Sequence, residues 1–467
     1  MSDGQVLLAV PRPPRDLDGH ALLAFHLQRR HGIKTRLFTG PELERDLLSH
    51  PPDVLVLDFL GWPDRAIQAR LAHRLGIAVA LLPTAGVYPD PVWFLRAAGK
   101  FTGVSRSVAA FLLWGNYSRD TLLEDKLAAP ARIWVTGCPR FDFYAPPYLS
   151  LMTQRTALLD RLGITNHQAP LILWSTNTNE WNNRHGRGGK AWRQRAGDAA
   201  SIPNQELVAI LQDQKTQFHA HSTVVSELAA LHPEWNVLIR VHPLEAVTPY
   251  ERIAAKRNNL FVDSTAPIRD LLYHCNVLLQ RGCTVATEAW MLDKPVLQLS
   301  MGSFQMEWAT PEHLAGSHPV ATIAEADEVI RGYLSGMPIP QAQLEARQRY
   351  LERYYYRVDG RSAERCADAL AAIVETAKRT GPDRAVIAER ARAALQDLRR
   401  KEAQRLPNRV KDVLHIEREK SLRIWRQGPA QINPSQVAEL FARFAQALQA
   451  AQPDNPGQKS RTESNGG

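Results

Sequence analysis

The stretch Asn276-Val-Leu-Leu-Gln-Arg-Gly-Cys-Thr-Val-Ala-Thr-Glu-Ala-Trp290 carries the pattern that decides the fold. Its first residues, 276–280, form a short apolar run that predicts a strand, and Gly282 predicts a sharp turn after it. Residues 284–292 then follow a helical period, and a second apolar run covers 296–299. A strand, a helix and a second strand in this order predict a unit of a parallel sheet.

The same alternation extends in both directions from this unit. On the N-terminal side of 276 it predicts strands at 171–175, 236–241 and 260–263 and helices at 204–231 and 268–274. A first series predicts strands at 6–10, 34–38, 54–60, 77–82 and 131–136, with helices at 19–30 and 66–75 between them. We therefore predict an α/β fold with two Rossmann-like domains that face a cleft.

The domain boundaries follow from where the alternation breaks. Residues 144–148 hold two prolines and indicate a linker, and beyond Ala377 the strand pattern stops. We predict an N-terminal Rossmann-like domain at 1–146, a C-terminal one at 147–376, a basic helical extension at 377–451 and a disordered tail at 452–467. A chain of 467 residues is long enough for about three such units.

Composition narrows the class of protein. Apolar residues make up 44% and charged residues 22%, which is ordinary for a globular protein. The four cysteines form no CxxC pair, so neither a disulfide scaffold nor a zinc module is indicated. There is no apolar run of the roughly 18 residues that a membrane span requires, and residues 1–10 lack a signal-peptide pattern. We expect a cytoplasmic protein.

The net charge of +9 is concentrated in one segment. Residues 378–426 hold 15 Lys and Arg against 7 Asp and Glu, and the rest of the chain is nearly neutral. A nucleic-acid partner is therefore not favoured. The segment fits a solvated helical extension, but Leu422, Ile424 and Trp425 beside the basic residues also fit a peripheral anchor on the anionic inner face of a membrane.

The segment Val237-Leu-Ile-Arg-Val-His-Pro243 places polar residues at a strand end, where ligands of such sheets bind. Arg240 and His242 are suited to hold a phosphate by charge-assisted hydrogen bonds, and Pro243 ends the strand. The alternative is that the HisPro pair only turns the chain. The same dipeptide recurs at His50, His232 and His318.

In the opening stretch, the predicted strand ends at Gly282 and Cys283, where the backbone can approach a ligand closely. Thr284 begins a helix whose first N–H groups favour an anion, and Glu288 lies on the same face one turn later. Such a carboxylate suits the two hydroxyls of a ribose. The alternative is an ordinary N-cap followed by a solvated glutamate.

A third strand end, Leu171-Ile-Leu-Trp-Ser-Thr-Asn-Thr-Asn179, leads into a long basic loop. Thr176, Asn177 and Asn179 are candidates to bind phosphate or sugar hydroxyls, because loops of this length usually carry function. An asparagine-rich turn is the alternative.

These segments together carry a resemblance. Thr136-Gly-Cys-Pro-Arg-Phe-Asp142, residues 173–179, Arg240-Val-His-Pro-Leu-Glu245 and Gly282-Cys-Thr-Val-Ala-Thr-Glu288 with Lys294-Pro295 resemble bacterial surface carbohydrate biosynthesis proteins of the GT-B glycosyltransferase superfamily. The resemblance covers about residues 6–374. The chain is similar in plan to capsule and lipopolysaccharide Kdo transferases and to polyol-phosphate polymerases of wall teichoic acid. The resemblance implies that the second half binds a nucleotide-sugar donor and the first half a glycan or glycolipid acceptor.

The sequence departs from that superfamily at one position. The resemblance implies an acidic residue after the fourth strand of the first half, where this chain has Ala85. Either another carboxylate, such as Asp58, Asp90 or Asp142, serves as the base or nucleophile, or the reaction does not need one. Asp58 also fits a turn or an N-cap, and Asp142 also fits an ion pair with Arg140.

We predict from this a metal-independent glycosyltransferase with no cofactor, in which Arg240, His242 and the helix start at Thr284 stabilise the leaving phosphate. His219 and His221 point to different faces of a predicted helix, which disfavours a metal site. The alternatives on the same plan are a CDP-polyol phosphotransferase and a UDP-sugar 2-epimerase. An alternative of another class is a noncatalytic scaffold in polysaccharide assembly, for which Ala85 would be a symptom of lost chemistry.

Overall fold

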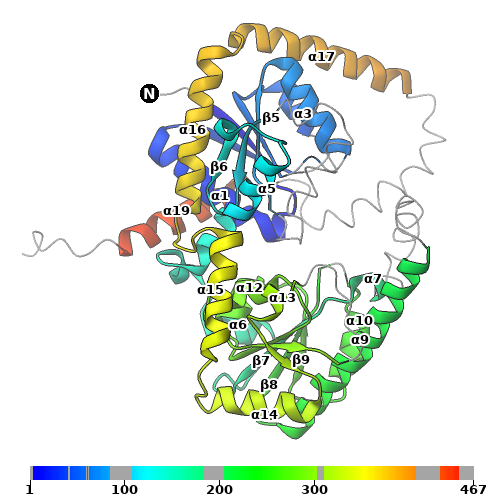
Figure 1. The fold of residues 1–467 in the computed structure, drawn as a ribbon. Coiled ribbons are helices and arrows are strands. Elements are labelled where there is room, and N and C mark those ends of the chain that lie inside the picture. The colour runs from blue at the N-terminus through cyan, green and yellow to red at the C-terminus, as the bar shows by residue number, and fades with distance from the viewer. Residues whose placement is uncertain are drawn as a thin grey trace, which may run out of the picture.

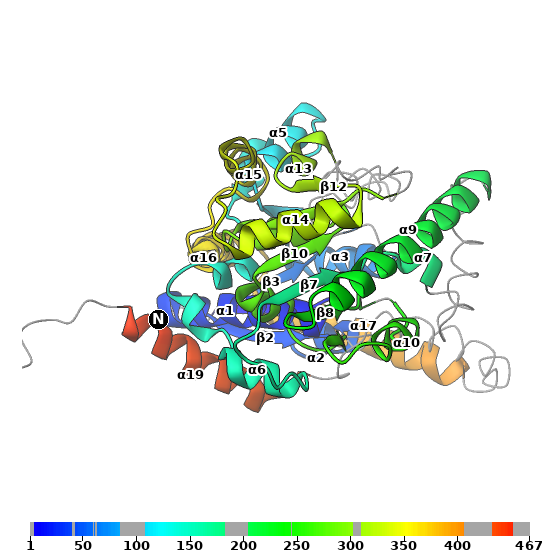
Figure 2. The same ribbon diagram turned by 90° about the horizontal axis from the view of Figure 1, so that it is seen from below.

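The computed structural model describes residues 4–39, 43–58, 60, 63–84, 108–182, 204–243, 245–301, 310–405 and 432–451. Within these ranges, the strands form two six-stranded sheets, one in each half of the chain. The first half lies at the top of Figure 1 and the second at the bottom, and Figure 2 views the molecule from below. Every strand pairing is parallel, as the alternating pattern predicts.

The first sheet has the strand order β2-β1-β3-β4-β5-β6. Its strands are β1 (Gln5–Ala9), β2 (Lys34–Phe38), β3 (Val54–Leu57), β4 (Ala78–Leu81), β5 (Val108–Leu113) and β6 (Ile133–Val135). The connecting helices are α1 (Pro13–His31), α2 (Leu43–Ser49), α3 (Pro63–Leu75), α5 (Asn116–Glu124) and the 3-10 helix η2 (Pro130–Arg132). The order reverses between β1 and β3, which is where such sheets bind ligands.

Both faces of the first sheet are buried. Val6 and Leu8 of β1 point to α1 and to the later helix α16, while Leu7 and Ala9 point to α2 and α3. Alternate residues of a strand face opposite sides, so apolar residues at every position are required when helices cover both. This explains why the strand reads as a continuous apolar run.

The second sheet has the strand order β12-β11-β10-β7-β8-β9. Its strands are β7 (Leu171–Ser175), β8 (Asn236–Arg240), β9 (Leu260–Asp263), β10 (Val277–Gln280), β11 (Val296–Leu299) and β12 (His318–Val320). The helices of this half are α6 (Arg155–Arg161), α7 (Asn179–Asn182), α9 (Asn204–Leu231), α10 (Thr248–Ala254), α11 (Ile268–His274), α12 (Val285–Trp290), α13 (Pro311–Leu314), α14 (Ile323–Leu334) and α15 (Gln341–Tyr355).

Helices cover the second sheet in the same way. Ile172 and Trp174 of β7 pack toward α9 and α14, which lie in front of the sheet in Figure 2. Leu171 and Leu173 pack toward α6, α11, α12 and α15 on the other face. The two-layer burial of each sheet makes each half a Rossmann-like domain.

Within the described residues, the chain crosses between the halves twice. The first crossing contains the 3-10 helices η3 (Pro139–Tyr144) and η4 (Tyr148–Leu151), and the second joins α15 to α16 (Ser362–Thr380). Gly360 has a positive φ of 71°, and a side chain there would meet the carbonyl oxygen of Pro146 at 2.3 Å. The two crossings therefore touch each other.

After the second crossing the chain packs on the first half. Cys366, Leu370 and Val374 of α16 are buried against the first sheet (Figure 1). Residues 362–376, which the sequence places with the second domain, thus contribute to the first. A helix that spans 362–380 also runs through the boundary expected at 376.

The extension beyond α16 is not a solvated arm where the structure describes it. Ile387 and Ala391 of α17 (Arg384–Arg405) are buried against α2 and α3. Leu440 and Phe444 of α19 (Pro434–Ala450) are buried against α1, alongside which α19 lies in Figure 2. Each of these helices therefore buries an apolar face on the first half, while Arg390 and Arg392 of α17 remain exposed. The segment with Leu422, Ile424 and Trp425 lies outside the described residues.

Candidate functional site

The end of β8 is joined to the end of β7 by hydrogen bonds at the carboxyl edge of the second sheet. The His242 amide donates to Oγ1 of Thr176 at 2.8 Å, and the Thr176 amide donates to the Arg240 carbonyl at 3.1 Å. Thr176 is almost fully buried, with 1% of its surface exposed. Its hydroxyl therefore fixes the backbone on which the His242 imidazole is carried.

Charges from the first half reach this edge. The pKa of His242 is lowered to about 4, first by burial and then by the positive charges of Arg12, Arg240 and Arg15. Arg12 and Arg15 lie at the start of α1, directly after β1. The carboxyl edges of the two sheets thus face each other, and the His242 imidazole between them is neutral at pH 7.

The guanidinium of Arg240 is engaged within the second half. It lies 3.5 Å from the Asp263 carboxylate at the end of β9, and only 11% of its side chain is exposed. Burial lowers its pKa and the charge of Asp263 opposes this. From the first half, the positive charges of Arg12 and Arg15 act on His242, and neither residue is among the predicted site residues.

A buried carboxyl group ties the two site loops together. Glu245 accepts hydrogen bonds from the Thr178 amide and from the Tyr250 hydroxyl. Burial raises the pKa of Glu245 to about 7, although the hydrogen bonds from Tyr250 and Thr178 lower it. Because Thr178 follows β7 and Glu245 follows β8, this contact holds the loop of Thr176 against the loop of His242.

The turn after β10 is shaped by two glutamines. Gly282 has a φ of 50°, and its amide donates to Oε1 of Gln298 at 2.8 Å. The Cys283 amide donates to Oε1 of Gln280 at 2.7 Å. Thr284 precedes α12 as predicted, but its side chain makes no capping hydrogen bond. The amides of Ala286 and Thr287 at the helix start donate to the carbonyls of Cys283 and Thr284, so these two N–H groups already have protein acceptors.

Glu288 connects the second half to the first crossing. Its carboxylate accepts a hydrogen bond from the Tyr144 hydroxyl and lies 3.5 Å from a guanidinium nitrogen of Arg140. Only 7% of the side chain is exposed, so the alternative of a solvated glutamate is wrong. The same contacts show that Arg140 pairs with Glu288 and not with Asp142.

The first sheet contributes a compact charged edge. Arg15 forms two hydrogen bonds with the Asp16 carboxylate, at 2.6 and 2.8 Å, and a third with Oγ1 of Thr84 at 3.2 Å. Asp58, at the end of β3, pairs with Arg65 at 3.0 Å and is 5% exposed. The charges of Asp16 and Asp58 act on His20, whose pKa is nevertheless lowered because burial dominates. Asp58 thus lies at the strand end where the sequence places it.

The geometry assigns Asp142 a structural contact. Its two carboxylate oxygens accept the amides of Ser362 and Ala363, at 2.8 and 2.7 Å, and cap the start of α16. Burial raises its pKa to about 7, although those hydrogen bonds lower it. The carboxylate is 1% exposed. Because the carboxylate is buried and each of its oxygens accepts a backbone amide, we do not include Asp142 in the proposed catalytic site.

The remaining predicted residues are placed as follows. Asn177 is half-buried and Pro243 is exposed at the same edge as Thr176 and His242. The backbone of Asn179 begins α7, and its side chain lies outside the described residues, as do Ala85 and Asp90.

A signal in the sequence points to Arg12 and Arg15, since they follow the first apolar run in Val10-Pro11-Arg12-Pro13-Pro14-Arg15. The rule that ligands bind at strand ends applies to this loop as it does to 240–243. Glu245 carries no comparable signal, because its role depends on Tyr250 and Thr178 closing around it.

His219 and His221 both lie on α9, and among the described residues no group of three or more His, Cys, Asp or Glu is placed to hold a metal ion. No described helix is long and apolar enough to cross a bilayer.

Comparison with known proteins finds similarity in structure and not in sequence. No protein-family model and no curated protein matches the chain. The structure is similar to a UDP-GlcNAc 2-epimerase from Neisseria meningitidis bound to UDP-GlcNAc, with a TM-score of 0.51, 14% identity, and 78% of this chain and 99% of that chain covered. It is also similar to a putative UDP-N-acetylglucosamine 2-epimerase from Listeria monocytogenes, with a TM-score of 0.51 and 13% identity. That comparison covers 81% of this chain and 98% of the other. A third similar structure is a variant of the wall teichoic acid polymerase TagF soaked with CDPG, with a TM-score of 0.51 and 10% identity. That comparison covers 80% of this chain and 90% of the other.

Identities this low establish the fold and nothing finer. The protein has a GT-B-like fold, with two Rossmann-like domains and additional C-terminal helices that pack on the first.

Proposed function

We propose that the protein is a glycosyltransferase that moves a sugar from a nucleotide-sugar donor to a surface polysaccharide or lipopolysaccharide acceptor. The observation that carries this proposal is the position of His242 between the carboxyl edges of the two sheets, with Arg12 and Arg15 acting on it from the opposite side. A diphosphate placed between the edges meets cationic groups of one half and a neutral imidazole of the other.

The charges suit the departure of a nucleotide. When the glycosidic bond of the donor breaks, negative charge develops on the leaving phosphate, and fixed positive charges beside it stabilise the transition state. In this proposal, Arg12 and Arg15 supply the charge. His242 donates a hydrogen bond from its neutral imidazole, on a backbone that Thr176 holds. No metal or other cofactor takes part in the proposed reaction.

The acceptor side requires a base, and Asp58 is the carboxylate that we propose for it. It lies at the end of β3, on the first sheet's edge, and forms an ion pair with Arg65 at 3.0 Å. Removal of the acceptor proton by Asp58 makes the hydroxyl oxygen nucleophilic toward the anomeric carbon. Asp58→Asn should then lower kcat by about 10²-fold or more with little change in donor affinity, which steady-state kinetics with the identified donor will test.

A UDP-sugar 2-epimerase is the second candidate. It is favoured by the structural similarity to two such enzymes over nearly their whole length. The similarity to TagF supports a CDP-polyol phosphotransferase in the same way. Both candidates use the same two edges, but they differ from the glycosyltransferase in the bond that is broken.

A donor screen with mass spectrometry distinguishes these reactions. The protein is incubated with UDP-, GDP-, CMP- and CDP-linked sugars and CDP-polyols, with and without a glycan acceptor extract. The proposal expects nucleotide release that depends on the acceptor and a new glycoside. An epimerised nucleotide sugar formed without acceptor would overturn it in favour of the epimerase, and a phosphodiester product in favour of the phosphotransferase. Failure of all nucleotides to raise the melting temperature would favour the noncatalytic scaffold.

We further propose that residues 378–426 hold the enzyme against an anionic membrane surface, where a glycolipid acceptor is found. The local excess of positive charge supports this. Because α17 and α19 pack on the first domain, deletion is a poor test and charge reversal is a better one. Arg418→Glu with Lys420→Glu should reduce sedimentation with vesicles that contain phosphatidylglycerol, whereas unchanged sedimentation would remove this part of the proposal.

A further inference from the structure

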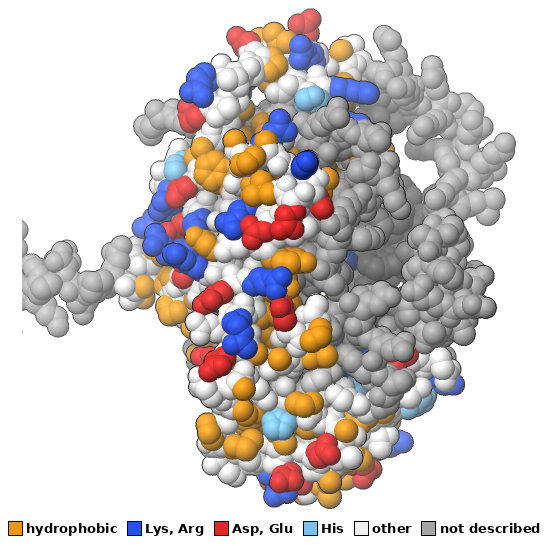
Figure 3. Space-filling model, viewed as in Figure 1, with side chains coloured by type: hydrophobic (Ala, Val, Ile, Leu, Met, Phe, Trp, Pro, Cys, Tyr) orange, Lys and Arg blue, Asp and Glu red, His pale blue; other side chains and the backbone are white. Residues whose placement is uncertain are grey.

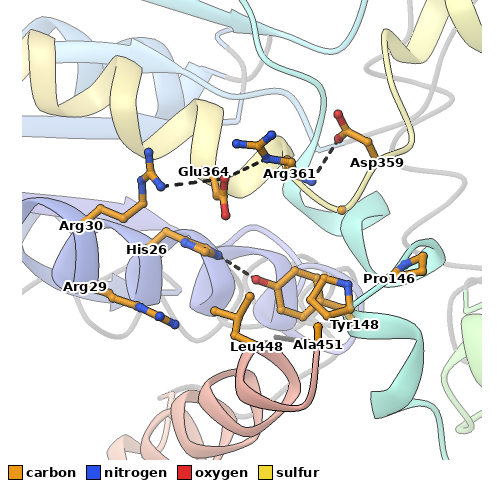
Figure 4. A pocket seen from close by; sticks show the side chains of 12 residues that line it. His26, Arg29, Arg30, Pro146, Tyr148, Asp359, Arg361, Glu364, Leu448 and Ala451 are labelled. Carbon is orange, nitrogen blue, oxygen red and sulfur yellow. Dashed lines mark hydrogen bonds and ion pairs between the residues drawn. The ribbon is translucent and has the colours of Figure 1, made fainter. Parts of the chain in front are cut away.

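A pocket lies at the crossing between the halves, away from the carboxyl edges of the sheets. Its volume is about 370 Å³, within the range of small-molecule sites. Figure 4 shows its walls, which come from parts of the chain that are far apart in the sequence. They are the C-terminal part of α1, the prolines before η4, the start of α16 and the end of α19.

The polar wall of the pocket is rich in arginine. Arg29 and Arg30 come from α1, and Arg361 precedes α16. Lys and Arg side chains also gather on the surface where α16 begins, as Figure 3 shows. An arginine is planar and carries several N–H donors, which is why it predominates in phosphate sites.

The carboxylates around the pocket are already paired. Arg30 forms two hydrogen bonds with Asp368, at 3.1 and 3.0 Å, and Glu364 lies 3.1 Å from Arg361. Asp359 accepts two hydrogen bonds from Arg365, at 3.0 and 2.8 Å. These pairs fix the arginines in place and neutralise the acidic groups that would repel an anion.

Arg29 is the arginine of the pocket wall that takes no part in these ion pairs. Among the described residues no ion pair joins it to a carboxylate, and its nearest ring contact is with Phe25, whose centroid lies 5.8 Å from the guanidinium carbon. A positive charge at the rim of a pocket with no acidic partner is an attractive position for an anionic ligand.

A buried histidine lies at the same pocket. His26 is 2% exposed, and its Nε2 is 2.8 Å from the Tyr148 hydroxyl. Its Nδ1 is buried and has no hydrogen-bond partner. Such a group is costly to leave unsatisfied and is a common mark of a missing partner. Burial lowers the pKa of His26 to about 4, so the ring is neutral and one of its nitrogens can donate at neutral pH.

The rest of the wall is apolar. Pro146, Pro147, Leu448 and Ala451 contribute to it, together with the ring of Tyr148. A bare phosphate ion would leave this apolar part unfilled, whereas an organic group attached to the phosphate would cover it.

We propose that this pocket at the crossing binds a phosphomonoester, with its phosphate on Arg29, Arg30 and Arg361 and its organic part against the prolines and Leu448. This site is separate from the donor site of the proposed function and does not depend on it, because none of its lining residues belongs to the carboxyl edges of the sheets.

The probe for the test is phenyl phosphate, titrated calorimetrically into the full chain. We expect saturable binding that Arg29→Ala weakens at least tenfold and that Arg29→Lys partly restores. Arg349→Ala removes an exposed arginine from α15 and serves as the matched control, with affinity unchanged within twofold. Arg12→Ala should also leave the affinity unchanged. Arg29 makes no ion pair with another residue that the structure describes, so its replacement is expected to leave the fold intact, which circular dichroism will verify.

Three outcomes would overturn the proposal. They are the absence of saturable binding, equal binding by wild type and Arg29→Ala, and loss of binding in Arg12→Ala, which would place the probe at the sheet edges. Phenol, which lacks the phosphate, should not bind, and equal binding of phenol would also contradict the assignment. Vesicles that contain phosphatidic acid distinguish two kinds of natural ligand. If the vesicles compete with phenyl phosphate, the ligand is a phosphomonoester lipid. If they do not compete, it is a soluble phosphomonoester.

Discussion

The two halves share a plan but differ at the edges that meet. The edge of the first sheet is built from charges, with Arg15 on Asp16 and Arg65 on Asp58. The edge of the second combines the Arg240–Asp263 ion pair with hydroxyl and amide contacts around Thr176 and between Gln280 and Gln298. Charged groups hold an anion, and neutral donors in a fixed backbone give the site its shape.

The halves also differ in how their sheets are covered. The second sheet is covered by helices that lie between or directly after its own strands, such as α9 and α14. The first sheet and its helices are completed by α16, α17 and α19 from the far end of the chain. The first half therefore shares its cores with helices that follow the second half in the sequence, whereas the clusters around the second sheet contain no described residue of α17 or α19.

The largest effect is expected from the imidazole of His242 at the junction of the two edges. His242→Ala removes a donor beside the proposed leaving phosphate, and we expect kcat/KM for the donor to fall by about 10²- to 10³-fold. His50→Ala is the matched control, since His50 also precedes a proline but its side chain is 68% exposed. Steady-state kinetics with the donor found by screening is the measurement. An unchanged value in His242→Ala would show that charge from the first half acts without this residue.

The next effect tests the dependence of the first half on α16. Asp142→Ala removes the acceptor of the Ser362 and Ala363 amides and leaves two buried N–H groups without a partner. We expect a loss of about 2–3 kcal/mol in the free energy of unfolding, measured by urea denaturation with circular dichroism. Asp142→Asn retains one acceptor oxygen and should lose less. Equal stability of wild type and Asp142→Ala would mean that α16 is held by its apolar face alone.

A smaller effect is expected for α17. Ile387 is 7% exposed against α2 and α3, whereas its neighbour Val386 is 38% exposed. Ile387→Ala should cost about 2 kcal/mol of unfolding free energy, the low end for a core isoleucine because the site is at the edge of the core. Val386→Ala should cost less than half of that. If both variants are as stable as wild type, α17 is not part of the first domain's core.

The smallest effect is expected from pH, because the His242 ring should not titrate between about pH 6 and pH 8. Because the pKa of His242 is about 4, its ring should stay neutral between about pH 6 and pH 8. The unfolded chain binds the proton at a higher pH, so this group destabilises the fold as the pH falls from about 6.5 toward 4. The NMR signal of the ring, assigned with His242→Ala, should not shift between about pH 6 and pH 8. A midpoint near the ordinary value would make His242 a cation in the site and contradict the contrast between the edges.

The sequence predicts the fold better than it predicts the site. Strands 171–175, 260–263 and 296–299 agree with β7, β9 and β11 residue by residue, because buried parallel strands are unbroken apolar runs. β5 and β12 were not predicted. β5, at 108–113, is an apolar run that periodicity cannot distinguish from a helix, and β12 has three residues with a proline among them.

The site is harder to predict from the sequence because its contacts join distant segments of the chain. The patterns at 240–243 and 282–284 predicted strand ends correctly, since a motif that ends a strand is local. The partners of Glu288 come from the first crossing, and the amides that occupy Asp142 lie some 220 residues away along the chain. No local pattern records such contacts. The carboxylate–amide contact places Asp142 at the start of α16, and no property of the residue itself indicates this contact.

The central claim is that one nucleotide is held by both edges at once. A double-mutant cycle of nucleotide affinity, measured by calorimetry with Arg12→Ala, His242→Ala and the double variant, tests this most directly. We predict that each single variant weakens binding by about tenfold or more, near 1.4 kcal/mol, and that the double variant loses less than the sum. Arg12→Ala with the affinity of wild type would contradict the claim, because the nucleotide would then be held by the second half alone.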